Sequence, residues 1–143
     1  MKRLRPLLAL PFLVTPPANA APTYLTCSIT ETASEVGGKV FEPSKTPLTV
    51  ELTLNEDQQT ASYYLPSTGL TQRLGATFQR DVITFKTESQ SSMKTSDSWS
   101  LDRVAGTLTR SFQAYATGAV PMKMIDKTSS GPCKKAAAPE RQF

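Results

Sequence analysis

The sequence predicts an all-β protein, namely a small antiparallel up-and-down β-barrel closed by one disulfide, with a β-sandwich as the alternative. Short runs in which apolar and polar residues alternate with a period of two follow one another along the chain, separated by turn-forming residues. One cysteine lies near each end of this region. A closed barrel sets the first strand beside the last, where Cys27 and Cys133 can bond, so we favour the barrel.

The first twenty residues predict a secretory signal peptide. Three cations within residues 2–5 precede an apolar stretch at 7–14, and Ala18 and Ala20 place small side chains at the −3 and −1 positions of a cleavage site before Ala21. A membrane anchor is the alternative, but this stretch is far shorter than the roughly 20 residues that span a bilayer. We expect a mature periplasmic or secreted protein that does not span a membrane. The expected organisation is a signal peptide at 1–20, a single β-domain at 21–133 and a flexible C-terminal tail at 134–143.

Period-two alternation places the predicted strands. Residues 24–30 carry Cys27 on their apolar face, and in residues 48–55 four aliphatic side chains face one side while polar side chains face the other. A break is predicted at 66–69, and the Ser- and Thr-rich segment 88–98 is predicted to be mobile. Further strands are predicted at 60–65, 74–79, 82–88 and 119–125, with a hairpin at 98–114.

The hairpin at 98–114 has the best-defined predicted register. If Ala105 and Gly106 form a two-residue turn, large apolar side chains of both strands share one face. A slip by one residue would separate them. The predicted cross-strand pairs are Trp99 with Phe112, Leu101 with Arg110 and Arg103 with Leu108.

Cys27 and Cys133 are predicted to form a disulfide. An even number of cysteines in an exported chain favours pairing, and neither thiol has a nearby histidine or second cysteine that would activate it or complete a metal site. The bond would close a loop of 106 residues. In the chain-entropy model such a loop stabilises the fold by about 4–5 kcal/mol.

The charge balance argues against nucleic acid and against anionic membranes as partners. The full sequence has 16 Lys and Arg against 12 Asp and Glu, and three of these cations belong to the predicted signal peptide. The remaining cations form no cluster interleaved with aromatic residues, which is the pattern typical of nucleic-acid binding. Adsorption to anionic lipid lacks a driving force for the same reason.

The sequence offers little for catalysis. It contains no histidine, so the commonest general base and metal ligand is missing. We expect a protein that is not an enzyme and that uses no metal and no cofactor. The alternative is a hydrolase in which the fold brings two carboxylates into one cleft. The candidates for such a pair are Glu31, Glu51, Glu88, Asp97, Asp102 and Asp126.

Two arginines fall in phase with the predicted core of the hairpin, and a guanidinium there needs a partner. One interpretation is an anion-recognising patch in the barrel mouth, with both arginines as donors and an aromatic ring as an apolar wall. The other is structural: both lie near strand ends and reach solvent or pair with Asp81 or Asp126. The candidate ligand-binding residues are Arg103, Arg110, Trp99 and Tyr63.

Three short segments carry a resemblance: the opening 24–27, the hairpin region 99–108 and the closing Gly131-Pro132-Cys133. They resemble uncharacterised small exported proteins of Gram-negative bacteria and cyanobacteria that have cysteines near both ends. This resemblance implies a periplasmic or secreted β-domain. The clasped small barrel is also similar to bacterial periplasmic lysozyme inhibitors, although the Ser-Gly-containing inhibitory loop of that family has no clear match.

Together these observations predict a non-catalytic binding module of the bacterial cell envelope. It would engage an unknown envelope protein or a small ligand through the loops at one barrel end. A carboxylate-dependent envelope hydrolase and a lysozyme-inhibitor-like protein are the alternatives. A binding module should expose an apolar or aromatic patch near its loops.

Overall fold

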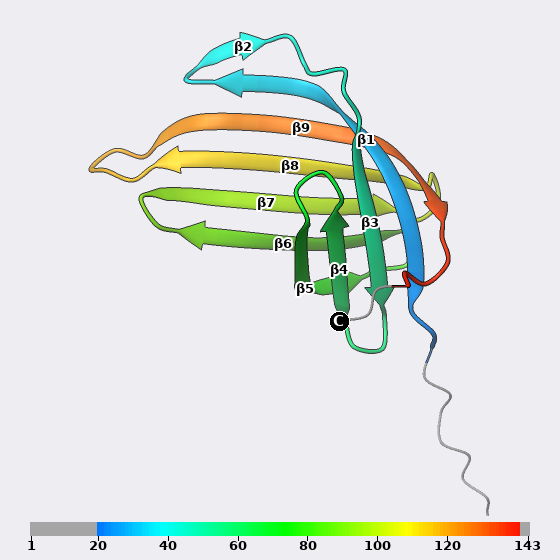
Figure 1. The fold of residues 1–143 in the computed structure, drawn as a ribbon. Helices are drawn as coiled ribbons and strands as arrows, with labels where there is room; N and C mark the ends of the chain where they lie inside the picture. The colour runs from blue at the N-terminus through cyan, green and yellow to red at the C-terminus, as the bar shows by residue number, and fades with distance from the viewer. Residues whose placement is uncertain (1–19, 141–143) are drawn as a thin grey trace, which may run out of the picture.

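The computed structural model describes residues 20–140, which form nine β-strands (Figure 1). The predicted signal peptide lies outside the described residues except for Ala20, and so do the last three residues of the predicted tail. Nothing in residues 20–140 forms a helix of the length and apolarity needed to cross a membrane. The strands are β1 (Thr23–Val36), β2 (Lys39–Phe41), β3 (Leu48–Asn55), β4 (Thr60–Leu65), β5 (Leu70–Phe78), β6 (Val82–Gln90), β7 (Met93–Asp102), β8 (Thr107–Ala116) and β9 (Met122–Lys135).

The strands close an eight-stranded antiparallel barrel, which confirms the predicted fold. Neighbours follow chain order from β3 to β9, and β1 lies between β3 and β9 and so completes the ring. The short β2 pairs only with the far end of β1, outside the ring. Cys27 and Cys133 are direct cross-strand partners on β1 and β9, with Cα atoms 4.0 Å apart, and form the predicted disulfide.

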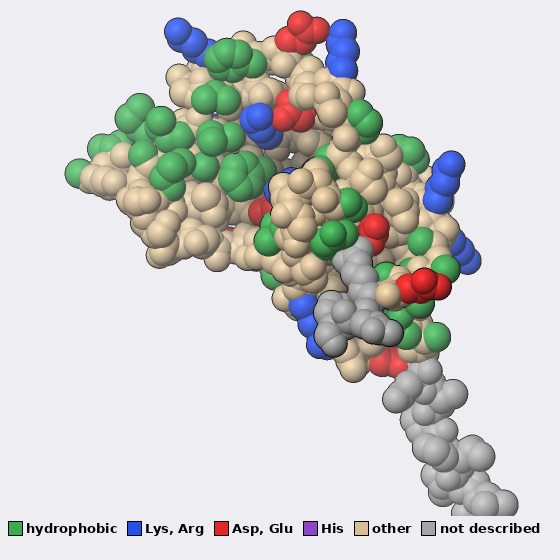
Figure 2. Space-filling view, viewed as in Figure 1, with side chains coloured by type: hydrophobic (Ala, Val, Ile, Leu, Met, Phe, Trp, Pro, Cys, Tyr) green, Lys and Arg blue, Asp and Glu red, His purple; other side chains and the backbone are tan. Residues whose placement is uncertain are grey.

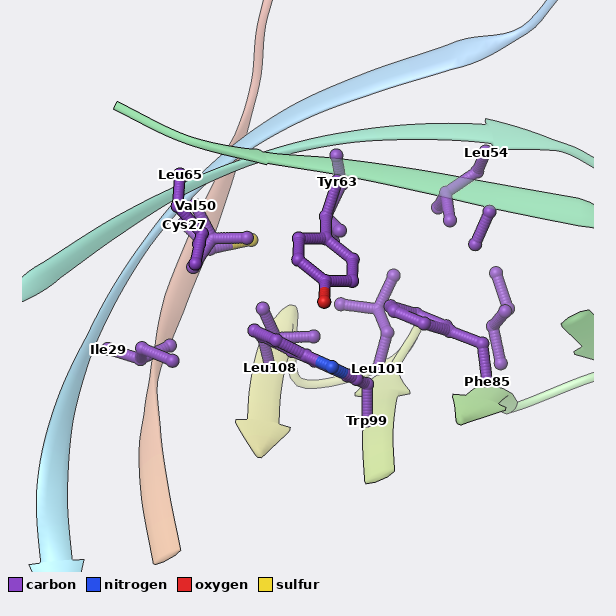
Figure 3. Close-up of a cluster of buried hydrophobic side chains, with 13 residues drawn as sticks. Cys27, Ile29, Val50, Leu54, Tyr63, Leu65, Phe85, Trp99, Leu101 and Leu108 are labelled. Atoms are coloured by element: carbon purple, nitrogen blue, oxygen red, sulfur yellow. The ribbon is translucent and has the colours of Figure 1, made fainter. Parts of the chain in front are cut away.

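A core of alternating inward side chains fills the barrel at the disulfide end. On β3 and β4 every second residue is buried, as period-two alternation predicts. Trp99 lies at the centre, stacked on Phe85 with ring centroids 5.9 Å apart and tilted against Tyr63 at 4.9 Å (Figure 3). Aromatic pairs at these separations add about 0.5–1.5 kcal/mol each to the effect of burial.

The opposite end of the barrel is open because its strands have unequal lengths. β3 and β4 have 8 and 6 residues, whereas β1 and β9 have 14 each. The long strands β6 to β9, together with β1 and β2, continue past the barrel as a curved sheet (Figure 1). The inner face of this sheet therefore continues the barrel interior without a facing wall.

The predicted register of the β7–β8 hairpin is wrong by two residues. The turn contains four residues, 103–106, because the Asp102 carboxylate accepts hydrogen bonds from the backbone N–H groups of Val104 and Ala105, both at 2.8 Å. Gly106 completes the turn with a positive φ of 66°. A two-residue shift keeps every side chain on its predicted face but changes its partner. The observed pairs are Leu101 with Leu108, Trp99 with Arg110 and Asp97 with Phe112.

The Ser- and Thr-rich segments predicted as loops are strands. Residues 88–98 form the ends of β6 and β7 around a tight turn, and β9 extends from Met122 through Lys135 instead of ending at residue 125. Thr95 and Ser129 face inward, but many hydroxyl groups of the sheet lie on its outer face, in cross-strand rows. One such row consists of Thr77, Thr84, Ser100, Thr109, Ser130 and Thr30, one residue on each of six adjacent strands.

Gly131 lies where the backbones of β9 and β1 come close together. A Cβ atom at this position would overlap the backbone carbonyl of Ser28 and crowd the Cα atom of Ile29. We therefore expect Gly131→Ala to lower the free energy of unfolding by about 2 kcal/mol or more, since the backbone of the closing seam must move. Urea unfolding measures the effect. Gly75→Ala, in a strand with no atom near the new methyl group, is the control, and equal losses for the two variants would contradict this role of Gly131.

Candidate functional site

A pocket of about 230 Å³ lies where the closed barrel passes into the open sheet. Strands β1, β3, β8 and β9 supply its inward-facing residues, and the connection between β2 and β3 crosses it with Ser44 and Thr46. We call this pocket the mouth. Its lining residues are Ile29, Glu31, Ser44, Thr46, Leu48, Arg110, Phe112, Lys127 and Ser129.

Arg110 enters the mouth from β8 and forms a bidentate ion pair with Asp97. Its Nε and Nη2 atoms each donate to one carboxylate oxygen at 2.8 Å, and the two side chains are 23% and 9% exposed. The guanidinium carbon lies 4.8 Å from the centre of the Trp99 ring and 5.8 Å from that of Phe112. Two hydrogen bonds and two aromatic contacts therefore hold the guanidinium in one position. Its partner is neither Asp81 nor Asp126, which corrects the structural interpretation made from the sequence.

A second ion pair crosses the mouth. The Lys127 ammonium donates to Glu31 Oε1 at 3.0 Å, and the backbone N–H of Ser44 donates to Glu31 Oε2 at 2.9 Å. The Ser44 amide and the Lys127 charge together hold the pKa of Glu31 below its ordinary value. Glu31 is thus ionised at neutral pH and tethers the β2–β3 connection over the pocket.

The two predicted aromatic site residues lie beneath the mouth, in the core. Trp99 and Tyr63 are each 2% exposed. The Tyr63 hydroxyl donates to Gln72 Oε1 at 2.6 Å, and burial followed by the nearby Asp97 charge raises the pKa of Tyr63. The Trp99 indole N–H has no hydrogen-bond partner among the described residues. These rings support Arg110 from below.

Arg103 lies at the opposite end of the barrel, away from the other three predicted site residues. It belongs to the β7–β8 turn, donates through Nη1 to the carbonyl oxygen of Gln79 at 3.1 Å, and has Glu56 Oε2 3.7 Å from Nη2. The two-residue change in register accounts for this position, because it places residue 103 in the turn and outside the strand. Arg110, Trp99 and Tyr63 come together; Arg103 does not join them.

The carboxylates considered for a hydrolase are dispersed among the described residues. Glu31 lines the mouth, Glu51 lines a groove on the outer face, and Asp102 lines a pocket at the disulfide end. Asp97 does not line the mouth but pairs with Arg110, which does, and Glu31 pairs with Lys127, so each of these carboxylates is neutralised by its own cation. The remaining pairs are Glu88 with Lys86 and Asp126 with Lys123. A general acid needs a raised pKa, whereas that of Glu31 is lowered.

Beyond the mouth, the inner face of the open sheet is largely apolar. Cross-strand pairing puts Ala114 beside Thr95 and Ile125, and Ile125 beside Val36, all on the same face. Figure 2 shows hydrophobic side chains gathered over this end of the molecule. We call this surface the apolar shelf; its residues are Val36, Met93, Phe112, Ala116, Met122 and Ile125, which surround the buried Ala114.

Sequence reasoning missed Lys127 and most of the shelf. Both depend on β9 starting at Met122 and continuing as a strand through its hydroxyl-rich part. The available signal was the alternation itself, since Ile125, Lys127 and Ser129 are two residues apart, like the residues of a strand face.

No protein-family model matches the chain, and no curated protein is significantly similar to it in sequence. The geometry of the mouth and the shelf is therefore the basis for assigning a function.

We expect Arg110→Met to destabilise the fold by about 3–5 kcal/mol, because it leaves the Asp97 carboxylate largely buried without its cation. The double variant Arg110→Met/Asp97→Leu should recover much of this loss, since it removes both charges. Urea unfolding at pH 7 measures both. A double variant as unstable as the single variant would show that the ion pair is not the source of the effect.

The mouth should also respond to acid. Because the folded-state pKa of Glu31 is lowered, its contribution to stability is fully present above the unfolded-state pKa of about 4.3 and is lost as the pH falls through the folded-state pKa. We expect Glu31→Gln to be less stable than wild type at pH 7, and we expect this deficit to shrink as the pH is lowered from 5 to 3, by thermal unfolding. Glu42→Gln, which removes an exposed carboxylate paired with Lys45, is the control and should differ little at either pH. A Glu31→Gln deficit that persists unchanged at pH 3 would contradict the assignment.

Proposed function

We propose that the protein is an exported, non-catalytic binding module of the bacterial cell envelope that holds an apolar part of its target on the shelf at the open end of the barrel. One observation carries the proposal: an inner barrel surface continues past the mouth without a facing wall, and apolar side chains line it. Concave apolar surfaces with a few fixed polar groups are typical of binding sites.

The exposure of the shelf supports a role in binding. Val36 is 39% exposed and Met122 is 63% exposed, although both project from an inner face. Phe41 of β2, 51% exposed, pairs with Ser34 and adds exposed apolar area on the same face as the shelf. Contiguous apolar surface of this kind is usually covered by a partner or a ligand.

The mouth supplies the polar floor of the proposed site. Arg110 and Lys127 are each paired with a carboxylate, so the floor is fixed before a target arrives and carries little net charge. A preorganised floor lowers the ordering cost of binding. A target with an apolar segment and neutral polar groups suits this arrangement better than a strongly charged one.

Export is the second part of the proposal. A disulfide between β1 and β9 is consistent with an oxidising extracellular or periplasmic location. The cations that precede the apolar stretch 7–14, and the small side chains of Ala18 and Ala20 at the predicted cleavage site, support the same location.

The test compares two charge insertions on protein isolated from the periplasmic fraction, after intact mass has established cleavage before Ala21 and an oxidised cysteine pair. We expect Val36→Asp/Met122→Asp to lose at least tenfold in capture of a target from envelope extract, because two carboxylates would be desolvated on the shelf. Val104→Asp/Ala105→Asp, two exposed positions in the turn at the disulfide end, should capture the target as wild type does. Equal capture by the two double variants would overturn the proposal.

A further inference from the structure

The mouth offers more hydrogen-bond donors than its own acceptors use. Asp97 takes one hydrogen each from Nε and Nη2 of Arg110, which leaves Nη1 for another acceptor. The Lys127 ammonium gives one of its N–H groups to Glu31 and keeps the others. Glu31 is the carboxylate of the lining, and both of its oxygen atoms already accept a hydrogen bond. A ligand that enters the mouth therefore meets unused donors, and oxygen acceptors are the groups that satisfy them.

Cross-strand pairing sets these donors side by side at the edge of the apolar shelf. Ser129 of β9 pairs with Glu31 of β1 and with Arg110 of β8, so it lies between the acid of one ion pair and the base of the other and adds a hydroxyl group. Two residues further towards the open end, Lys127 pairs with Phe112. The donors thus end where the shelf begins.

The shelf beyond Phe112 has the length of one acyl chain. From Phe112 to Ala116, four residues along β8, the backbone rises by about 14 Å. The hydrocarbon core of a bilayer is about 30 Å thick and consists of two layers of acyl chains, so one chain spans about 15 Å. Met93 and Met122 flank Ala116 at the far end, and methionine side chains adapt to flexible apolar partners.

The charges of the mouth select against an ionic head group. Arg110 is paired with Asp97 and Lys127 with Glu31, so these four groups carry no net charge. An ionised head group would lose its hydration without gaining a counter-charge. Ester and hydroxyl oxygens accept from the unused donors at a lower desolvation cost. The volume of the mouth, about 230 Å³, has room for several such groups.

We propose that the target held by the shelf is a lipid with one acyl chain and an uncharged, oxygen-rich head group, of which a monoacylglycerol is the simplest example. The head-group oxygens accept hydrogen bonds from Arg110, Lys127 and Ser129 in the mouth, and the chain lies on the shelf with its end towards Met122. This assignment rests on the proposed function, because it names the class of target that the shelf binds.

The test titrates the oxidised protein with 1-monolauroylglycerol, below the concentration at which the lipid forms micelles, by isothermal titration calorimetry. We expect this lipid to bind at least tenfold more tightly than dodecyltrimethylammonium, which has a chain of the same length and a cationic head group without acceptors. Ser129→Ala should weaken binding of the lipid about fivefold, which is the effect of one lost hydrogen bond. Ser130→Ala removes a hydroxyl from the outer face of the same strand and should leave binding unchanged.

The placement of the chain has its own pair of variants. Val36→Asp/Met122→Asp should lose at least tenfold in affinity for the lipid, whereas Val104→Asp/Ala105→Asp should bind it as wild type does. Equal affinities of these two double variants would place the chain elsewhere than on the shelf and so overturn the assignment. Thermal unfolding and circular dichroism of each variant verify that a lost signal does not reflect a lost fold.

Three further outcomes would overturn the lipid assignment. The first is no binding of 1-monolauroylglycerol by wild type, or binding no tighter than that of the cationic amphiphile. The second is equal affinity of Ser129→Ala and Ser130→Ala for the lipid. The third is binding of laurate at least tenfold more tightly than of 1-monolauroylglycerol, which would identify an anion site instead. Capture from envelope extract tests the shelf independently of the lipid, so these outcomes leave the proposed function to be decided by that experiment.

Discussion

The pairing of β1 with β9 is the constraint on which the rest of the structure depends. β1 has three neighbours, because it pairs with β3 over its first half, with β2 at its far end and with β9 along most of its length. The Cys27–Cys133 disulfide crosses this seam between residues that lie opposite one another. The ladder shifts register between Glu31 and Ala33, where the extra residue bends β1 away from the barrel. A single strand therefore both closes the barrel and carries the sheet beyond it.

This division of β1 explains why the two ends of the molecule differ. At the disulfide end all eight strands face one another, so alternating apolar side chains bury completely around Trp99. Past residue 30 the wall made by β3, β4 and β5 ends, and several inward side chains, such as Met93, Ala116 and Met122, are partly or largely exposed. The two ion pairs lie where the closed barrel gives way to the open sheet. Deeper in the core, burying their charged groups would cost more free energy, and further out, solvent would weaken the attraction within each pair. The mouth is thus a boundary set by strand length.

Alternation, together with the turn residues and the two cysteines near the ends, was enough to predict the fold class, the closing disulfide and the face on which most side chains lie. The prediction failed in residues 88–98, where composition was given more weight than the period of the alternation. Serine and threonine are typical of loops but also suit the solvent-exposed face of a strand. It also failed on register. Because the sidedness of a strand repeats every two residues, a two-residue error leaves the pattern intact, and only the Asp102 carboxylate that caps two backbone amides distinguishes the registers.

The candidate site was predictable only in part, for a related reason. Arg110 could be recognised as an inward cation, but its partner Asp97 sits one ladder step away from its direct neighbour, and that step depends on the correct register. The shelf could not be inferred, because whether an inward face is covered depends on the lengths of strands on the other side of the barrel. Local sequence determines which way a side chain points. Only the assembled sheet determines what it meets.

The environment of Trp99 shows how these constraints combine in one residue. The Trp99 indole N–H is buried with no partner among residues 20–140, which costs about 1–3 kcal/mol, yet the ring is held by Tyr63, Phe85 and the guanidinium of Arg110. Cation–π contact with a largely desolvated guanidinium contributes up to about 2 kcal/mol, and the ring buries more apolar area than any other residue type could. The carboxylate of Asp97 fixes that guanidinium against the ring, so the ion pair acts on the core as well as on the mouth. The polar floor of the candidate site and the apolar centre of the barrel are therefore one packed unit, and a rigid floor follows from the same contacts that stabilise the fold.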